Sequence, residues 1–325
     1  MAEAPIGSVY RPRGSVAGPD EDGFTMVVAA LEGLGDTVLD AWPTTTILVG
    51  DAPSTAPEDL ARYLGLSDPP LPEAVASLPA ALARLASGAG TGTPALLLGA
   101  HLPSRPPVGA GPREAGGEDE AVAIWFPDSA SVVDLERQGI ERWDDLAGRW
   151  RPPTESGGPS PSLELVARPE VALRPDLPVA QGAYTPWPRY VEGIPAHWRL
   201  VAERCAACGK VSFPPRGRCR ACDATAGLEK VRLNRDEGTV VAATTIGPGG
   251  QPTEFDEQVS LSGPYGVAVV EFGPGLRATL QLTDVDRPTA PIGARVRTRL
   301  RRIYTMEGRW RYARKAIPAP GPVAA

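Results

Sequence analysis

Apolar positions in the first 130 residues recur at two spacings, which distinguish predicted helices from predicted strands. FTMVVAALEGLG, residues 24–35, has apolar side chains at helical spacing and a glycine stop, and the preceding Asp20, Glu21 and Asp22 suit a helix start. The pattern also predicts helices over 57–66 and 72–90, the second weakened by Pro79, and short buried strands over 44–51, 94–102 and 120–128. Strands that alternate with helices of this length indicate an α/β layer with a largely parallel sheet.

The pattern changes after Pro152. Residues 151–190 are too rich in proline and glycine for regular structure, so we expect a linker or a strap there. A short amphipathic helix over 190–203 is followed by β-forming runs at 238–247, 265–272, 276–284 and 294–304. Five or so strands with no helix between them suit a small closed barrel, most economically an OB-type fold. The predicted domains are an α/β domain over 1–150, a linker over 151–190, a helix plus cysteine-rich segment over 191–228, a barrel over 229–318 and a tail over 319–325.

Composition and charge narrow the class of protein. The 325-residue chain can bury a core without cross-links, and its most apolar runs are too short to cross a bilayer. No charged-then-apolar leader opens the sequence, so we expect a cytoplasmic protein in a reducing compartment. Residues 197–325 carry 20 Lys and Arg against 12 Asp and Glu, a balance of +8, which leaves −14 for residues 1–196 and −6 for the chain. The basic part could dock on the acidic part, or hold a polyanion such as nucleic acid or a phosphorylated cofactor.

All four cysteines lie in RCAACGKVSFPPRGRCRACDA, residues 204–224. They form two Cys-x2-Cys pairs with ten residues between the pairs: Cys205, Cys208, Cys219 and Cys222. Gly209 follows the first pair and Asp223 the second, which is typical of two tight knuckles that place four thiolates about 2.3 Å from a zinc ion. Four thiolate ligands leave no open coordination position, so the spacing predicts a structural metal site. Iron fits the same ligands, whereas a redox Cys-x-x-Cys pair would favour a helix start beside a βαβ unit.

Basic residues surround the cysteines and would offset the negative charge of a tetrathiolate zinc centre. They are Arg204, Lys210, Arg216, Arg218 and Arg220.

The C-terminal half resembles a known family. CAACGKVSFPPRGRCRACDA, the preceding AHWRL, GTVVAATTIG and PYGVAVVEFGPGLRATLQLTD are similar to the zinc-ribbon plus OB-fold proteins that associate with acyl-CoA enzymes. The resemblance covers about residues 185–318. It implies a rubredoxin-like ribbon held by the four cysteines, an OB barrel, and a partner that is a thiolase-superfamily enzyme or an acyl-CoA hydratase.

The N-terminal half resembles one half of a thiolase fold. AGPDEDGFTMVVAALEGL looks like an early helix of hydroxymethylglutaryl-CoA synthase-like proteins, and EAGGEDEAVAIWF like a later turn and strand of the same half-fold. Thiolase-type condensation needs an activated cysteine, but no cysteine precedes Cys205, and the helix near EAVASLPAALARL offers only Ser77. The family's base histidine lies in the half that is missing. We therefore expect a degenerate half-thiolase layer without catalytic groups.

The sequence ARVRTRLRRIY predicts a row of positive charge. Arg295, Arg297, Arg299 and Arg301 recur at period two, on one face of a strand. The row could bind the phosphates of coenzyme A, a nucleic-acid backbone or the acidic half of the chain, or it could be a solvated barrel face. We take it as the candidate cofactor-binding set.

Other candidates have simpler structural interpretations. His101 ends a buried strand and His197 lies in the helix before the ribbon, so packing is expected for both. The acidic cluster of residues 20–22 suits a helix N-terminus. Tyr304, Trp310 and Tyr312 fit a terminal strand that closes the core, and IGPGGQP, residues 246–252, fits a flexible turn.

These observations predict a non-catalytic accessory subunit that binds a thiolase-superfamily enzyme and helps to bind or channel acyl-CoA. Two alternatives stay open at this point: an acyltransferase that works through Ser77 or His101, and a nucleic-acid-binding ribbon and barrel. Few aromatic residues on the strands and an acidic chain count against nucleic acid. The acyl chain, the pathway, the partner's identity and stoichiometry, and zinc versus iron are not determined by the sequence.

Overall fold

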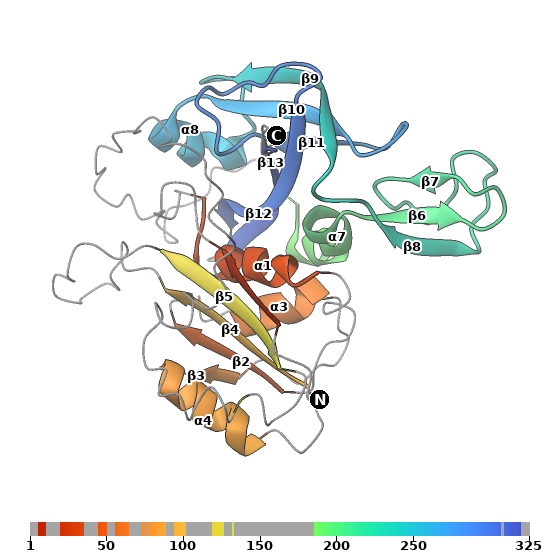
Figure 1. Cartoon of the computed structure of the whole chain (residues 1–325). Helices are drawn as coiled ribbons and strands as arrows, with labels where there is room; N and C mark the ends of the chain where they lie inside the picture. The colour runs from red at the N-terminus through yellow and green to blue at the C-terminus, as the bar shows by residue number, and fades with distance from the viewer. Residues whose placement is uncertain are drawn as a thin grey trace, which may run out of the picture. The chain divides into compact units, whose positions relative to one another are not determined.

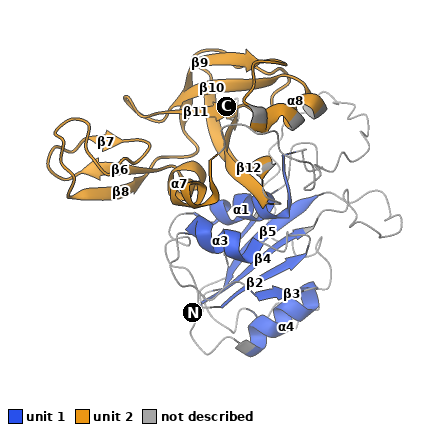
Figure 2. Cartoon of the chain, turned by 180° about the vertical axis from the view of Figure 1, so that it is seen from behind, with its two compact units in different colours: residues 1–166 blue, residues 167–325 orange. Residues whose placement is uncertain are grey.

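The computed structural model divides the chain into two compact units, residues 1–166 and 167–325 (Figure 1). Figure 2 shows the two units in different colours. The structure describes residues 6–10, 20–35, 45–50, 56–64, 73–75, 77–88, 94–101, 119–126, 132, 185–306 and 309–319. The division falls within the predicted linker, of which only residues 185–190 are described, so the predicted domain boundaries stay predictions.

The first unit contains a five-stranded sheet in the order β1-β5-β4-β2-β3. Its strands are β1 Ile6–Tyr10, β2 Thr45–Gly50, β3 Glu73–Val75, β4 Ala95–His101 and β5 Glu120–Phe126. Strand β2 runs parallel to β3 and β4, whereas β5 runs antiparallel to β4 and β1. The prediction of a largely parallel sheet is therefore wrong for half of these pairings. Antiparallel neighbours need no crossover helix, so a pattern of alternating helices and strands does not reveal them.

Three described helices flank this sheet: α1 Gly23–Gly33, α3 Ala56–Leu64 and α4 Leu78–Gly88. Helix α4 covers one face, while α1 and α3 lie on the other (Figure 1). Alternate residues of the central strands form the core beneath α4, and they include Ile47, Leu97 and Ile124. Because the intervening residues are buried as well, these strands read as continuous apolar runs.

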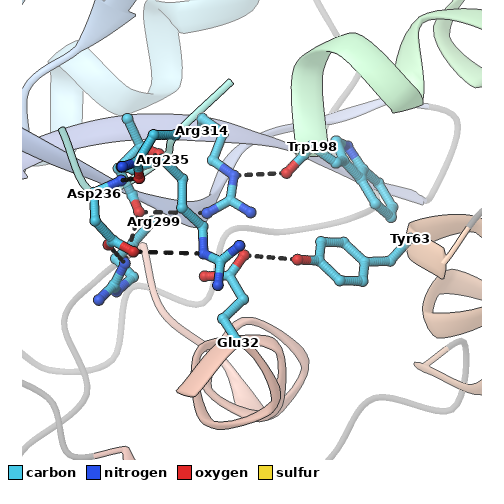
Figure 3. Close-up of polar contacts among 9 residues, drawn as sticks. Glu32, Tyr63, Trp198, Arg235, Asp236, Arg299 and Arg314 are labelled. Carbon is cyan, nitrogen blue, oxygen red and sulfur yellow. Dashed lines mark hydrogen bonds and ion pairs between the residues drawn. The ribbon is translucent and has the colours of Figure 1, made fainter. Parts of the chain in front are cut away.

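Helix α1 begins directly after the acidic residues 20–22, as the sequence predicts. The carboxylate of Asp22 accepts a hydrogen bond from the Thr25 N–H at 2.9 Å, and the Thr25 hydroxyl accepts one from the Asp22 N–H at 2.9 Å. This reciprocal cap satisfies two backbone donors that a helix start would otherwise leave unpaired. Further along α1, Glu32 accepts a hydrogen bond from the Tyr63 hydroxyl at 2.7 Å, and this buried bond joins α1 to α3 (Figure 3).

The predicted helix over 72–90 is partly wrong. Residues 73–75 form β3 at the edge of the sheet, and the helix begins only at Leu78. Pro79 then lies in the first turn, where a missing N–H costs no helical hydrogen bond. The position of the proline therefore fixes the helix start, and the residues before it are free to pair with β2.

The second unit begins with α7 Trp187–Arg199, which leads directly into a small three-stranded sheet in the order β7-β6-β8. Its strands are β6 Val201–Cys205, β7 Val211–Ser212 and β8 Leu228–Arg232. We refer to residues 201–232 as the ribbon. Leu200, between α7 and β6, has a positive φ of 54°, a left-handed helix end that turns the chain into the ribbon.

The rest of this unit is a five-stranded sheet in the order β11-β10-β9-β12-β13. The strands are β9 Gly238–Ile246, β10 Tyr265–Glu271, β11 Arg277–Gln281, β12 Arg295–Met306 and β13 Arg309–Pro318. A parallel bridge between Leu282 and Ala316 joins the two ends of the sheet, around a core that includes Val240, Val270 and Val296. The five strands are confirmed, and this closed order agrees with a five-stranded Greek-key barrel. The finer assignment to the OB family stays a proposal.

The prediction that no helix interrupts these strands is wrong. A short 3₁₀ segment, η2 Thr253–Phe255, and α8 Asp256–Ser262 lie between β9 and β10. Phe255 places its ring against Tyr265 and Tyr304, with centroids 5.7 and 5.6 Å away. The segment therefore packs against the barrel through the aromatic ring of Phe255. The polar residues DEQ that follow Phe255 gave no apolar pattern from which a helix could be predicted.

Polar contacts bind α7 and the chain before β9 to the barrel (Figure 3). The Arg314 Nε–H donates to the Trp198 carbonyl at 2.6 Å, and the Thr298 N–H donates to the Arg235 carbonyl at 2.7 Å. Arg299 pairs with Asp236 at 2.9 Å. These contacts join the end of α7 and the segment between the ribbon and β9 to β12 and β13 within one unit. Among the residues that the structure describes, no helix is both long and apolar enough to cross a bilayer.

Candidate metal centre

The four cysteines converge in the ribbon. Their Sγ atoms all lie within 4.8 Å of one another, with 3.6 Å between Cys205 and Cys222 and 3.6 Å between Cys208 and Cys219. A tetrahedral site with zinc–sulfur bonds of about 2.3 Å has sulfur–sulfur edges of about 3.8 Å. The thiols therefore fit a zinc ion, and they form a zinc-ribbon-type metal site.

Two knuckles with the same backbone geometry place the cysteines. The Gly209 N–H donates to the Cys205 carbonyl at 2.8 Å, and the Asp223 N–H donates to the Cys219 carbonyl at 3.0 Å. Gly209 has a φ of 71° and Asp223 a φ of 60°, in the left-handed region that glycine and aspartate enter most readily. The residues that the sequence singled out after each pair are thus the ones that close each turn.

Backbone and thiol groups act on the cysteines in opposite directions. The N–H groups of Ala221 and Cys222 point toward the sulfur of Cys219 and lower the pKa of that thiol to about 7. At Cys222 the Ala224 N–H favours the thiolate, but the neighbouring thiols of the cluster outweigh it and raise the pKa to about 12. Four thiolates therefore do not coexist here at neutral pH without a cation to hold them.

The centre is open on one side. Cys205 and Cys219 are buried, whereas Cys208 and Cys222 are exposed. The five basic residues predicted around the centre are all exposed: Arg204, Lys210, Arg216, Arg218 and Arg220. Arg218 forms an ion pair with Asp223 at 3.2 Å.

The predicted arginine row on β12 differs along its length in burial. Arg295 is exposed, Arg297 and Arg299 are half-buried, and Arg301 is fully buried with its guanidinium 3.3 Å from the Asp284 carboxylate. The buried end of the row therefore carries a barrel ion pair, and Arg295 is the member that faces solvent. A role in coenzyme A binding stays a prediction.

Other candidates from the sequence occupy structural positions. The Ser77 hydroxyl accepts a hydrogen bond from the Ala80 N–H at 3.4 Å, at the start of α4, as a helix cap does. His197 lies on α7 beside Gly193 but is exposed to solvent, so the packing expected for it is only partial, and local desolvation by its neighbours lowers its pKa. His101 ends β4 opposite Glu120 in the sheet, but its side chain lies outside the described residues.

Sequence reasoning missed an aromatic and arginine stack that supports α7. The Arg311 guanidinium lies 4.4 Å from the Trp187 ring centre and 4.7 Å from that of Tyr190, and Arg309 lies 4.9 Å from Trp187. Such contacts are favourable because the ring faces carry negative potential. The sequence did contain two separate patterns. Two aromatic residues are spaced i, i+3 on the helix, and two arginines are spaced i, i+2 on the last strand. Their proximity in space was not visible.

An α/β unit is thus followed by a helix, a four-cysteine zinc ribbon and a five-stranded barrel, which defines a metal-binding protein of the zinc-ribbon class. Residues 195–229 match the family model described as ChsH2, rubredoxin-like zinc ribbon domain. The chain belongs to the family of DUF35 domain-containing scaffold proteins, because it aligns with most of the length of two of them. The relative from Methanothermobacter thermautotrophicus is 32% identical over 110 residues, which are 34% of this chain and 77% of the relative. That from Methanocaldococcus jannaschii is 31% identical over 110 residues, 34% of this chain and 73% of the relative.

Two solved structures are similar at lower levels. The Ltp2-ChsH2(DUF35) aldolase shares 26% identity over 38% of this chain and 86% of that chain, with a TM-score of 0.30. A protein of unknown function from the DUF35 family of Sulfolobus solfataricus shares 19% identity over 37% of this chain and 75% of its own, with a TM-score of 0.25. At these TM-scores neither likeness bears on the fold of the whole chain.

Proposed function

We propose that this chain is a non-catalytic scaffold subunit that binds a thiolase-superfamily enzyme or an acyl-CoA hydratase. In that complex it helps the partner to hold or channel an acyl-CoA thioester. The observation that carries the proposal is the alignment with two proteins described as scaffolds, over about three quarters of each. The proposal assigns the ribbon and the barrel to docking.

The chemistry of the cysteines supports a role without catalysis. Every cysteine of the chain belongs to the ribbon cluster, and four thiolate ligands would fill the coordination sphere of a zinc ion. Bound zinc would cross-link the two knuckles and leave no position for water or substrate. A thiolase-type nucleophile would have to be a cysteine outside this cluster.

The remaining parts of the proposal concern the partner and its ligand. We assign the first unit to a degenerate half-thiolase layer that packs against the partner, and the barrel to the OB family. Arg295 and its neighbours on β12 would meet the phosphates of coenzyme A, for which planar guanidinium groups are suited. The location is proposed to be cytoplasmic, and the metal to be zinc rather than iron.

A scaffold of this kind would work by containment. A thioester held between two proteins meets less water and escapes less often than one at an open active site. We therefore expect the partner enzyme without the scaffold to be less stable, or to release more of its thioester intermediate into solution.

The test is co-expression with candidate thiolase-superfamily enzymes and acyl-CoA hydratases from the same organism, followed by size exclusion with light scattering. We expect one peak that contains both chains, and a lower yield of product or of soluble enzyme without the scaffold. Two separate peaks, with full activity in the enzyme alone, would overturn the proposal. Purified chain that becomes covalently labelled by radioactive acyl-CoA would support an enzyme instead.

A further inference from the structure

The ribbon has an open hollow beside the metal centre that a purely structural metal site does not require. Its volume is about 1000 Å³. It is lined by two prolines, three arginines, one aspartate and one cysteine of the metal centre: Pro214, Pro215, Arg216, Arg218, Arg220, Asp223 and Cys219. We call this feature the arginine hollow.

The arginine hollow carries unbalanced positive charge. Arg218 and Asp223 are paired at 3.2 Å, with side-chain exposures of 63% and 76%. Arg216 and Arg220 are exposed, and neither forms an ion pair with any residue that the structure describes. Two guanidinium groups therefore remain available to an anionic partner.

The backbone beneath these arginines is held in place. The Glu203 carboxylate accepts hydrogen bonds from the Arg216 N–H at 2.9 Å and the Gly217 N–H at 3.1 Å, which ties the loop to β6. Two consecutive prolines precede this point and Cys219 follows it, so a cysteine of the four-thiol cluster lies at the other end of the loop, where a bound metal would anchor it. A surface that is rigid before binding loses little conformational entropy when a partner docks.

The character of the arginine hollow favours a protein over a small ligand or a nucleic acid. Small-molecule sites enclose most of their ligand, whereas this hollow is open and its arginines are exposed. Single-stranded nucleic acid is gripped through stacked aromatic side chains, and no aromatic residue lines the hollow. Arginine is enriched at protein interfaces. The two prolines of the hollow have a restricted backbone before any partner binds.

We propose that the arginine hollow docks the ribbon onto an acidic patch of the partner enzyme, with Arg216 and Arg220 paired to carboxylates of that enzyme. The inference rests on the proposed function, because it assigns one surface of the scaffold to that interaction. Contacts between exposed opposite charges mainly increase the association rate and have a smaller effect on the final affinity. Dissolved salt screens these contacts and weakens them. The docking should therefore be fast and salt-sensitive.

The test uses the full, zinc-loaded chain and the partner enzyme identified by co-expression. The double variant Arg216→Glu/Arg220→Glu is compared with Lys230→Glu/Arg287→Glu, which makes the same charge change at exposed positions outside the hollow. We expect the hollow variant to bind about ten-fold or more weakly at low salt, mainly through slower association, and the control to change less than about three-fold. Zinc content and thermal unfolding should match the wild type in both variants. Hydrogen exchange should show protection of residues 213–223 by the partner.

The outcomes separate this inference from the proposed function. If the complex forms and both variants bind as the wild type does, the arginine hollow is not the docking surface, although the scaffold function stands. Equal losses in the two variants would mean a non-specific effect of charge and would also overturn the inference. A third outcome would assign the hollow to nucleic acid. In it, the wild type and the control variant bind single-stranded DNA, the hollow variant does not, and all three form the complex with the partner enzyme equally well. If the wild type forms no complex, both proposals fall together.

Discussion

The hydroxyl group of Tyr190 binds both main-chain polar groups of Tyr312. It accepts a hydrogen bond from the Tyr312 N–H at 2.7 Å and donates one to the Tyr312 carbonyl at 2.9 Å, and the Trp198 indole N–H donates to the same carbonyl at 2.8 Å. These residues are buried, and their contacts fasten α7 to β13. Because α7 leads directly into β6, they also fix where the ribbon starts.

Replacement of Tyr190 by Phe should destabilise the second unit. The variant keeps the ring but leaves buried main-chain groups of Tyr312 with fewer partners, which costs about 1–3 kcal/mol. Chemical denaturation of the full chain, followed by tryptophan fluorescence, measures this loss. Tyr304→Phe is the matched control, with an expected change below about 0.5 kcal/mol. Equal effects in the two variants would contradict the role assigned to the Tyr190 hydroxyl.

Gly266 on β10 should tolerate no larger residue. A Cβ atom there would lie 2.8 Å from the Pro288 carbonyl group and 2.8 Å from the Leu282 side chain. Gly266→Ala is therefore expected to cost about 1–3 kcal/mol or more, because the backbone of residue 288 must move. Gly247→Ala, where nothing lies within 4 Å of the added atom, should be close to neutral. A stability of Gly266→Ala equal to that of Gly247→Ala, by thermal unfolding, would show that the barrel is looser at this point.

Metal removal should unfold the ribbon and spare the barrel. We expect about one zinc per chain by plasma mass spectrometry, and almost none in Cys219→Ser, because a site of three thiolates binds zinc far more weakly. The barrel has its own apolar core and should keep its β-sheet circular dichroism. Ser212→Ala, on β7, is the control that should retain the metal. Full zinc content in Cys219→Ser, or stoichiometric iron in the wild type, would refute the assignment.

Acid should weaken the fold in part through His197. Desolvation lowers the pKa of this side chain below the usual 6.5, so as pH falls the unfolded chain takes up a proton more readily than the folded one. The stability that the neutral form provides is present above the unfolded pKa and is lost as pH falls toward the folded pKa. His197→Gln should therefore show a smaller loss of unfolding free energy between about pH 7 and pH 5. Identical pH profiles for the variant and the wild type would exclude this contribution.

The elements that follow from local sequence were predictable. Helix α1, strands β2, β4 and β5 and the barrel strands β9 to β12 arise from apolar periodicity, and each lies within a residue or a few of its prediction. Strands β1 and β3 were missed because short edge strands carry little periodicity. Their pairing depends on a neighbour distant in the chain, as with Ile6 opposite Trp125.

The metal centre was determined by the sequence alone, because its geometry is local: two short knuckles with Gly209 and Asp223 bring the cysteines together. The tertiary structure decided the roles of the arginines. Period two places the β12 arginines on one face, but only the fold buries Arg301 against Asp284 and leaves Arg295 exposed. The physical reason is that burial and ion pairing depend on which distant segments the barrel brings together, and a one-dimensional pattern contains no information on that.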